Sequence, residues 1–541
     1  MHTGSSNGEV FFGREGISAL LEKRLDAFLK GYRQNIGIIG PLFLGKSSLT
    51  QLFLSRLTKS EVVSVYFPCQ EFDSFERFSE RWMGELLRSF YSAFQKPLPP
   101  NFQLLIRSLK GIIPKTLGRM KLIRKLVLRR RYDPAFQELM ALSGVLHQEC
   151  GRKILIVLDD FDRLGELNLN DPFAALGKEI MVQKETLFIV TSSCRTRSQA
   201  IFREKLSLLF GNFEIIELGP FDFKEAEEFI KRRFPERVLE DELNRFLIRI
   251  TDGFPYYLDI LLKRLRLCFH ENEAPNRDLV METLAKELYE DRGMLYQHFQ
   301  SRLYQLAQGK PWPVFADILL AISLGHKKLL HITRFLHQKT SDVKKILEKL
   351  QALEAIEKHG SLFQITDPLF RFWLSKVYYR QRFLIERAPL ANIQCFRDDT
   401  EKAIQESAIA DQRELPKRIE ELFLKFHNDV VELNKRKFKC PHFTEVSSRP
   451  NNGRVFPVLA RNHQSRWLCQ VLSGQVTEDD IRTFVDDVKR LKTQIHKKLI
   501  VGLRGIDLNA KLLAQEAKIQ YLDLRNFNFL LDLYGKPKII F

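Results

Sequence analysis

The chain has 541 residues, of which 44% are hydrophobic and 28% are charged, and its formal net charge is +18. This length calls for three or four domains, no apolar run approaches the ~20 residues that cross a bilayer, and the N-terminus lacks a signal-peptide pattern. The seven cysteines stand singly, without CxxC pairs, which argues against a structural metal site. We therefore expect a cytoplasmic protein.

The positive charge is concentrated in two segments. Residues 101–132 contain ten Lys or Arg and no Asp or Glu, and residues 416–541 contain 23 Lys or Arg against 14 Asp or Glu. Such an excess favours polyanions, and nucleic acid before a membrane, although a merely solvated basic surface explains it equally well. The run MKLIRKLVLRRR predicts an amphipathic helix that meets DNA, an acidic partner or a membrane surface.

An apolar strand, a glycine-rich turn and an amphipathic helix follow one another in NIGIIGPLFLGKSSLTQLFLSRL. Gly40, Gly45, Lys46 and Ser47 fit GxxxxGK[ST], in which glycines let backbone N–H groups wrap phosphates at a helix N-terminus. Lys46 would reach the β- and γ-phosphates, and the Ser47 hydroxyl would ligate Mg²⁺. The pattern predicts an ATP and Mg²⁺ site. Two further loop residues are counted with it, Pro41 and Ser48.

A second acidic element follows in KILIVLDDFDRL, where a buried strand ends in two aspartates. We expect Asp159 to hold Mg²⁺ through water and Asp160 to polarise the attacking water. Further strands are predicted at VVSVYF, TLFIVTSS and FEIIEL. Ser193 ends one of them and would sense the γ-phosphate. Arg195 and Arg197 are either charge stabilisers or ordinary surface arginines.

Six segments then occur together in a characteristic order: FFGRE, GPLFLGKSS, VLDDFD, TSS, LGPFDFKEAEEFI and DGFPYYL. On these the chain resembles the archaeal-type STAND ATPases, which are ASCE-class P-loop proteins, over about residues 9–375. The resemblance implies an α/β fold with a five-stranded parallel sheet of order 5-1-4-3-2 and a helical lid. Relatives often carry an arginine where this chain has Asn212, which argues against a trans-acting arginine and for slow hydrolysis. The residues that the resemblance places near adenine are Phe11, Gly13, Arg14, Gly253 and Pro255.

From Trp312 the pattern is helix, short helix, helix and strand, which fits a winged helix-turn-helix. Its third helix would either enter a DNA major groove or pack within the protein as a nucleotide-dependent hinge. The net charge of this segment is small, and its third helix has no arginine to recognise guanine, so we favour the hinge.

After a helical linker, the order of helices and strands resembles the restriction-endonuclease-like PD-(D/E)XK fold. Alignment of VFPVLAR and WLCQVLSG puts Pro457, Gln470 and Leu472 at the Asp, Glu and Lys positions of active members, so we expect no nuclease activity. Val458 and Val471 are expected to pack inward, as is Leu468 or its neighbour. The rival interpretation is a migrated site built on the acids Glu421 or Glu445.

The sequence therefore predicts five parts: a P-loop core at 1–235, a lid at 236–300, a winged helix at 301–375, a linker at 376–415 and an inactive nuclease-like domain at 416–541. The predicted function is a STAND-type ATP-dependent switch that hydrolyses ATP slowly and acts on or near DNA. Two alternatives remain open, a nucleotide-gated DNA-binding protein and a scaffold that docks a protein partner or a second copy.

Overall fold

The computed structural model describes residues 11–57, 62–69, 72, 74–93, 98–206, 211–235, 239–268, 275–307, 312–383, 389–433, 436–448, 458–491 and 493–540. The chain divides into two compact units, Met1–Pro220 and Phe221–Phe541. In the part of the chain so described, no helix is both long and apolar enough to cross a membrane.

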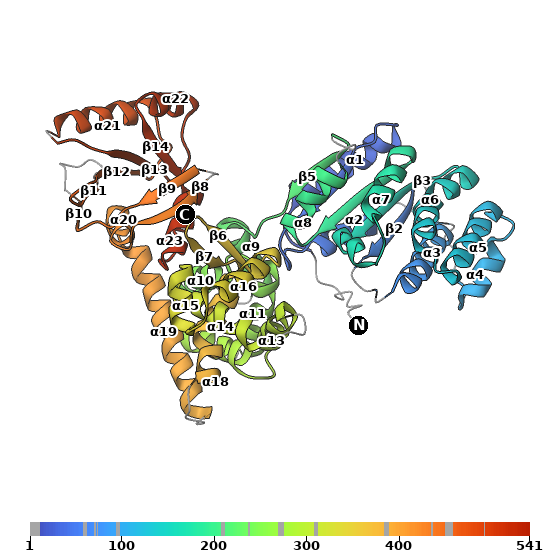
Figure 1. Ribbon diagram of the computed structural model, residues 1–541, viewed down its shortest axis with the longest axis horizontal. Coiled ribbons are helices and arrows are strands. Elements are labelled where there is room, and N and C mark those ends of the chain that lie inside the picture. The colour runs from blue at the N-terminus through green and yellow to red at the C-terminus, as the bar shows by residue number, and fades with distance from the viewer. Residues whose placement is uncertain are drawn as a thin grey trace. The chain divides into compact units, whose positions relative to one another are not determined.

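The first unit is built on a parallel sheet of five strands in the order β2-β3-β4-β1-β5. Figure 1 labels its two edge strands, β2 and β5. The strands are β1 (Asn35–Ile39), β2 (Val62–Pro68), β3 (Lys153–Asp159), β4 (Thr186–Ser192) and β5 (Phe213–Glu217). Strands β1, β3 and β4 are apolar almost throughout, as strands covered on both faces must be. The predicted α/β class, the five strands and the order 5-1-4-3-2 are confirmed.

Alternation along the strands assigns their side chains to two faces. Alternate residues of β2 and β3 join one large core with helices α3 (Phe75–Ser92) and α6 (Tyr132–Cys150). The residues between them face the other way, and there Tyr66 of β2 meets helix α2 (Lys46–Arg56). Because all five strands run parallel, the carboxyl ends of β1, β3 and β4 lie at one edge of the sheet. The sequence motifs that end these strands therefore meet there.

Two helices are inserted between β2 and β3, namely α4 (Phe102–Leu109) and α5 (Pro114–Leu128). Their apolar residues Leu105, Leu117 and Ile123 are buried in the core of the first unit. The ten basic residues of this insertion are all exposed. They are Arg107, Lys110, Lys115, Arg119, Lys121, Arg124, Lys125, Arg129, Arg130 and Arg131, and we call them the insertion patch. The predicted amphipathic helix is confirmed, with a second, shorter helix beside it.

The second unit begins with helices α9 (Phe223–Arg233), α10 (Asp241–Thr251), α11 (Pro255–Cys268), α12 (Arg277–Leu284) and α13 (Met294–Ala307). Helices α14 (Trp312–Ser323), α15 (Leu329–Leu336) and α16 (Thr340–Ala352) follow, and then the antiparallel strands β6 (Ile356–His359) and β7 (Leu362–Ile365). This is the succession of three helices and a strand that the sequence predicts, with a second strand added. After α17 (Pro368–Trp373), the long helix α19 (Pro389–Gln412) occupies the predicted linker.

The C-terminal part of this unit has a second sheet of five strands, in the order β10-β11-β12-β13-β14. Strands β10 (Glu445–Ser448), β11 (Val458–Arg461) and β12 (Arg466–Leu472) pair antiparallel, and β12 pairs parallel with β13 (Lys497–Gly502), which pairs parallel with β14 (Ile519–Asp523). Helices α20 (Leu415–Phe423), α21 (Glu478–Arg490), α22 (Leu508–Glu516) and α23 (Leu524–Leu533) accompany it. The sequence predicts these elements except the last helix, α23, and it does not predict the separate hairpin β8 (Asp429–Leu433) and β9 (Arg436–Cys440).

The β11–β12 register decides which residues of this hairpin face the main core. Val458 is paired with Cys469, and both lie with Val471 in a core that also contains Trp467. Leu468 lies on the opposite face, in a smaller core with Phe484 of α21. The inward packing of Val458 and Val471 is confirmed, and the neighbour Cys469 takes the place that we considered for Leu468. Pro457 lies outside the described residues.

A polar cluster joins the β6–β7 segment to the C-terminal sheet. The Asp532 carboxylate of α23 accepts hydrogen bonds from Arg371 and, at 2.5 Å, from Gln364, while the Lys327 ammonium donates to the Leu533 carbonyl at 2.5 Å. Only 18% of the Asp532 side chain is exposed. Burial alone would raise the pKa of Asp532, but the charges of Arg371 and Lys538 outweigh it and lower that pKa. Asp532 is therefore a charged group that links Gln364 of β7 and Arg371 of α17 to helix α23.

We expect Asp532→Ala to lower the free energy of unfolding of the second unit by roughly 2–3 kcal/mol, because it leaves Arg371 buried without its counter-charge. Urea unfolding of the full chain in a Trp82→Phe background measures this, since the other three tryptophans belong to the second unit. Asp479→Ala is the matched control, because its side chain is 92% exposed, and it should change stability by no more than ~0.5 kcal/mol. Equal effects of the two variants would contradict the prediction.

Candidate functional site: a phosphate-binding loop facing three buried aspartates

The loop from β1 to α2 can only be made with glycine at two positions. A β-carbon at Gly40 would lie 2.3 Å from the backbone oxygen of Leu218, a distance that no side chain tolerates. Gly45 has a φ of 84°, which is left-handed, and it caps the N-terminus of α2. The first N–H groups of that helix have no intrahelical acceptor, so they are available to an anion.

The ammonium group of Lys46 closes this loop. It donates to the carbonyl oxygens of Gly40 at 2.8 Å and Pro41 at 2.7 Å, and the side chain is only 5% exposed. Burial lowers the pKa of Lys46, whereas the nearby charges of Asp160, Asp159 and Asp162 act in the opposite direction. A buried cation held only by two neutral carbonyls is well suited to take a phosphate oxygen as a stronger partner.

Three buried aspartates follow the end of β3, and each accepts a hydroxyl hydrogen bond. Asp159 Oδ1 accepts from Thr191 at 2.5 Å, Asp160 Oδ1 accepts from Ser193 at 2.7 Å, and Asp162 accepts from Ser192 at 2.6 Å. All three hydroxyls come from the end of β4 and the residue after it. Each residue of the TSS motif therefore donates a hydrogen bond to one aspartate of the DDFD motif.

Burial raises the pKa of Asp160, and the hydrogen bond from Ser193 opposes this shift. Burial raises the pKa of Asp162 in the same way. The backbone of Asp160 is left-handed, with a φ of 50°, and its N–H donates to Thr191 Oγ1 at 3.0 Å. A carboxylate with a raised pKa accepts a proton more readily than an ordinary aspartate, which suits Asp160 to activate a water molecule.

Tyr66 is a residue of this cluster that no sequence motif indicates. Its hydroxyl donates to Asp159 Oδ2 at 2.6 Å and lies near the side chains of Ser47 and Gln51 on α2. Burial, followed by the charge of Asp159, raises the pKa of Tyr66, so the phenol keeps its proton at neutral pH. Strand alternation could have indicated it, because Val65 and Phe67 face the core and Tyr66 must face α2.

The structure places the residues of the FFGRE motif next to this loop. The Phe11 ring lies 3.7 Å from the position of a β-carbon on Gly45. Gly13 and Arg14 both have left-handed backbones, and Arg14 caps α1 (Glu15–Leu29) while its guanidinium donates to the Gly219 carbonyl. Ser47 is half-buried, and Ser48 and Pro41 are exposed.

The two candidate arginines lie in different surroundings. Arg195 forms a two-pronged ion pair with Glu217 at 2.8 and 2.9 Å. Arg197 reaches Asp162 at 3.3 Å and Glu166 at 3.1 Å. Asn212 lies just before β5, and its carbonyl accepts from the N–H of Asn35 on β1. The role of Arg195 in charge stabilisation stays a prediction.

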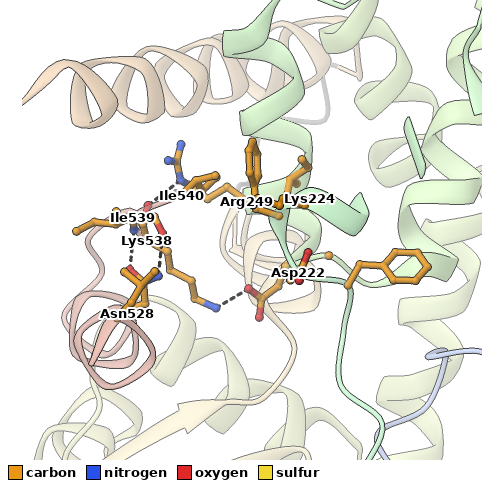
Figure 2. Close-up of a pocket in the computed structure, with 13 residues that line it drawn as sticks. Asp222, Lys224, Arg249, Asn528, Lys538, Ile539 and Ile540 are labelled. Carbon is orange, nitrogen blue, oxygen red and sulfur yellow. Dashed lines mark hydrogen bonds and ion pairs between the residues drawn. The ribbon is translucent and has the colours of Figure 1, made fainter. Parts of the chain in front are cut away.

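Gly253 and Pro255 belong to the second unit, so their approach to a nucleotide also stays a prediction. A β-carbon on Gly253 would lie 2.3 Å from the Phe221 carbonyl oxygen, and Pro255 begins α11. A pocket of about 400 Å³ lies beside this turn (Figure 2). Lys538 pairs with Asp252 at 2.5 Å, and the Arg249 Nε donates to the Lys538 carbonyl at 3.2 Å. These two contacts of Lys538 hold the C-terminal segment against the turn at Gly253.

The first unit's donor groups fit a nucleotide triphosphate and Mg²⁺. The loop has glycine at two positions that do not accept a side chain, Gly40 and Gly45, and it encloses the buried ammonium group of Lys46. Phosphate oxygens bind to loops that offer exposed backbone N–H groups and a cation in this way. Ser47 and Asp159 contact the same phenol, so their oxygens lie close together. Hydroxyl and carboxylate oxygens are the ligands that Mg²⁺ prefers.

No protein-family model matches this chain. No curated protein matches it either. Solved structures do. The Walker-type ATPase PABY2304 of Pyrococcus abyssi is 21% identical, with a TM-score of 0.47 over 67% of this chain and 96% of that one.

Two Aeropyrum pernix structures are also similar. The ORC2 protein, in ADPNP–ADP complexes, is 13% identical with a TM-score of 0.43 over 73% of this chain and 97% of that one. The ORC1 protein, in complex with DNA, is 14% identical with a TM-score of 0.40 over 69% and 95%. At identities and TM-scores this low, the function has to be argued from the geometry of the site.

Proposed function

We propose that this protein is a STAND-type molecular switch that binds ATP with Mg²⁺ and hydrolyses it slowly. One observation carries the proposal: the Lys46 ammonium lies inside a glycine-bounded loop and within the field of Asp159 and Asp160. A cation and carboxylates held this close are arranged for a ligand that brings both phosphate and metal.

Each residue has a defined task in this proposal. Backbone N–H groups from Leu42 to Ser47 and the Lys46 ammonium bind the phosphates, and Phe11 packs beside the loop where a base would lie. Ser47 and Asp159 would hold Mg²⁺, which would neutralise negative charge on the phosphates. Asp160 orients the attacking water and takes its proton, while Ser193 keeps the Asp160 carboxylate in place.

Hydrolysis is slow in this proposal because the two candidate arginines are already paired with carboxylates. Arg195 is paired with Glu217, and Arg197 is shared between Asp162 and Glu166. An arginine finger adds a factor of ~10³ or more to phosphoryl transfer, so its lack leaves a long-lived ATP state. A long-lived state is what a switch needs.

We further propose that α14–α16 with β6–β7 form a winged helix-turn-helix that acts as an internal hinge. The supporting contacts are Arg371 and Gln364 on Asp532, and Lys328 on Asp429 at 2.6 Å. These contacts join the segment to helix α23 and to strand β8 of the C-terminal domain. Lys344, Lys345 and Lys349 of α16 are nevertheless exposed, so the same element keeps a basic face for phosphates.

A paired set of variants tests the nucleotide site. Lys46→Ala should abolish tight ATP binding, because it removes the only cation inside the loop. Asp160→Asn should keep ATP affinity, since Ser47 and Asp159 are untouched, and lower turnover by ~10²-fold or more. Calorimetry measures binding and phosphate release measures turnover.

Wild-type affinity in Lys46→Ala would refute the site. Unchanged turnover in Asp160→Asn would refute the role of that carboxylate, and binding with no wild-type turnover would favour the nucleotide-gated scaffold.

DNA is the partner that we propose for the insertion patch and for residues 416–541. In the patch, ten exposed cations lie within 25 residues, and among the described residues only Arg119 forms an ion pair with a carboxylate, that of Glu138 at 2.6 Å. A surface of this kind gains affinity from the release of counterions when it meets a phosphate backbone.

We expect duplex binding that weakens steeply with salt. The triple variant Lys121→Gln, Arg124→Gln and Lys125→Gln should reduce the slope of log K against log salt by about 2–3, because each phosphate contact contributes about 0.9. The control replaces three exposed lysines of the same unit outside the patch, Lys23, Lys178 and Lys184, and should leave the slope unchanged. Equal slopes in all three chains, or no detectable binding at ~50 mM salt, would move the proposal to a protein partner.

The C-terminal domain is proposed to be nuclease-like in fold and inactive. Gln470 is 7% exposed and Leu472 is 9% exposed, so two of the aligned positions face a packed layer. The rival acids are engaged elsewhere: Glu445 pairs with Arg461 at 2.5 Å, and Glu421 pairs with Arg413 and with Lys536 at 2.8 Å.

The full chain should leave plasmid and linear DNA intact with Mg²⁺ or Mn²⁺, with or without ATP, because the aligned positions offer no carboxylate and no lysine. Gel electrophoresis of the incubated DNA checks this. Cleavage that disappears in Glu445→Gln or Glu421→Gln would identify a migrated active site and overturn the assignment.

A further inference from the structure

One phenol oxygen connects the two side chains that are proposed to hold Mg²⁺. Tyr66 contacts Asp159 of β3 on one side and Ser47 of α2 on the other. Register explains the first contact. Tyr66 is paired with Val157, two residues before Asp159, so both side chains leave the same face of the sheet. A phenol is long enough to bridge the ~6.6 Å that two residues of a strand span.

The chemistry of the three groups fixes the direction of their protons. An ionised carboxylate only accepts, so Tyr66 donates its single proton to Asp159. Its oxygen then has only lone pairs left, so a neighbouring hydroxyl such as that of Ser47 can approach it only as a donor. A Ser47 hydroxyl turned toward Tyr66 in this way would present its own lone pairs to another partner. Lone pairs are what a cation binds.

The Asp159 carboxylate is fixed at both oxygens. Tyr66 donates to Oδ2, and Thr191 donates to Oδ1 at 2.5 Å. The rotation of the carboxylate is therefore set by two elements on either side of β3, namely β2 and β4. A ligand that is already oriented loses less freedom when the metal binds.

We propose that Tyr66 is a positioning residue for Mg²⁺: it orients the Ser47 hydroxyl and the Asp159 carboxylate before the metal binds. This inference rests on the proposed function, because it concerns the metal that accompanies ATP. Groups that hold metal ligands in place typically contribute 10–100-fold to metal affinity. The opposite relation, in which Tyr66 competes with Mg²⁺ for the same two side chains, predicts a change of opposite sign.

Tyr66→Phe separates the two relations, because it removes one oxygen and keeps the ring. Binding of the non-hydrolysable analogue AMP-PNP to the full chain is measured by calorimetry across a Mg²⁺ series and in EDTA. We expect the Mg²⁺ concentration at half-effect to rise ~10-fold, with unchanged affinity in EDTA. Tyr132→Phe is the matched control, since it removes a surface hydroxyl bonded to Glu76 in the same unit, and its curve should coincide with the wild type.

A second variant keeps the test decisive. In a Ser47→Ala background, Tyr66→Phe can raise the Mg²⁺ requirement only by its effect on Asp159. The two substitutions together should therefore raise this requirement by clearly less than the sum of their separate effects. An unchanged or lower Mg²⁺ requirement in Tyr66→Phe, or full additivity with Ser47→Ala, overturns the positioning role alone. Failure of the wild-type chain to bind AMP-PNP overturns the proposed function, and this inference with it.

Discussion

Burial of three carboxylates at the end of β3 is the constraint on which the rest of the first unit depends. A charged group that leaves water is stable only if hydrogen bonds and an opposite charge replace its hydration. Here Thr191, Ser192 and Ser193 supply the hydroxyl donors and Lys46 supplies the charge. The order β3-β4-β1 satisfies this need, because it places the donor strand and the lysine-bearing turn beside the aspartates.

The same constraint acts in the second unit with a different result. Asp532 is held by Arg371 and Gln364, and Asp429 is held by Lys328 and Tyr534. The contacts of Arg371 and Gln364 with Asp532, and of Lys328 with Asp429, join the predicted winged-helix segment to the C-terminal domain. The hydrogen bond from Tyr534 to Asp429 lies within that domain. Such ties add little net stability compared with apolar packing, but they fix one docked arrangement against others. The predicted winged-helix segment and the C-terminal domain are therefore best regarded as one structural element.

Much of this could be predicted from the sequence, and the reasons are local. The glycine spacing at Gly40 and Gly45 and the apolar runs that end in Asp159 and Ser192 are short-range patterns, and the sheet order followed from the family resemblance. Tyr66 was missed because its role depends on the pairing of β2 with β3, which no local pattern records. Arg195 could not be placed from its neighbours in sequence, since its partner Glu217 belongs to another strand. The β8–β9 hairpin was missed because three of the five residues of β9 are basic, which hides the apolar alternation of the strand.

The contact between Gly40 and the Leu218 carbonyl has a consequence for how a signal could travel along the chain. Leu218 follows β5 and precedes Phe221, where the second unit begins, and the next carbonyl, that of Gly219, accepts from Arg14. The connecting segment thus rests directly on the phosphate loop and on the FFGRE motif. Tension in that segment would reach the loop through the close approach of the Leu218 carbonyl to Gly40, and it would reach the FFGRE motif through the Arg14 hydrogen bond. By reciprocity, a γ-phosphate that reshapes the loop would pull on the connector with the same coupling free energy.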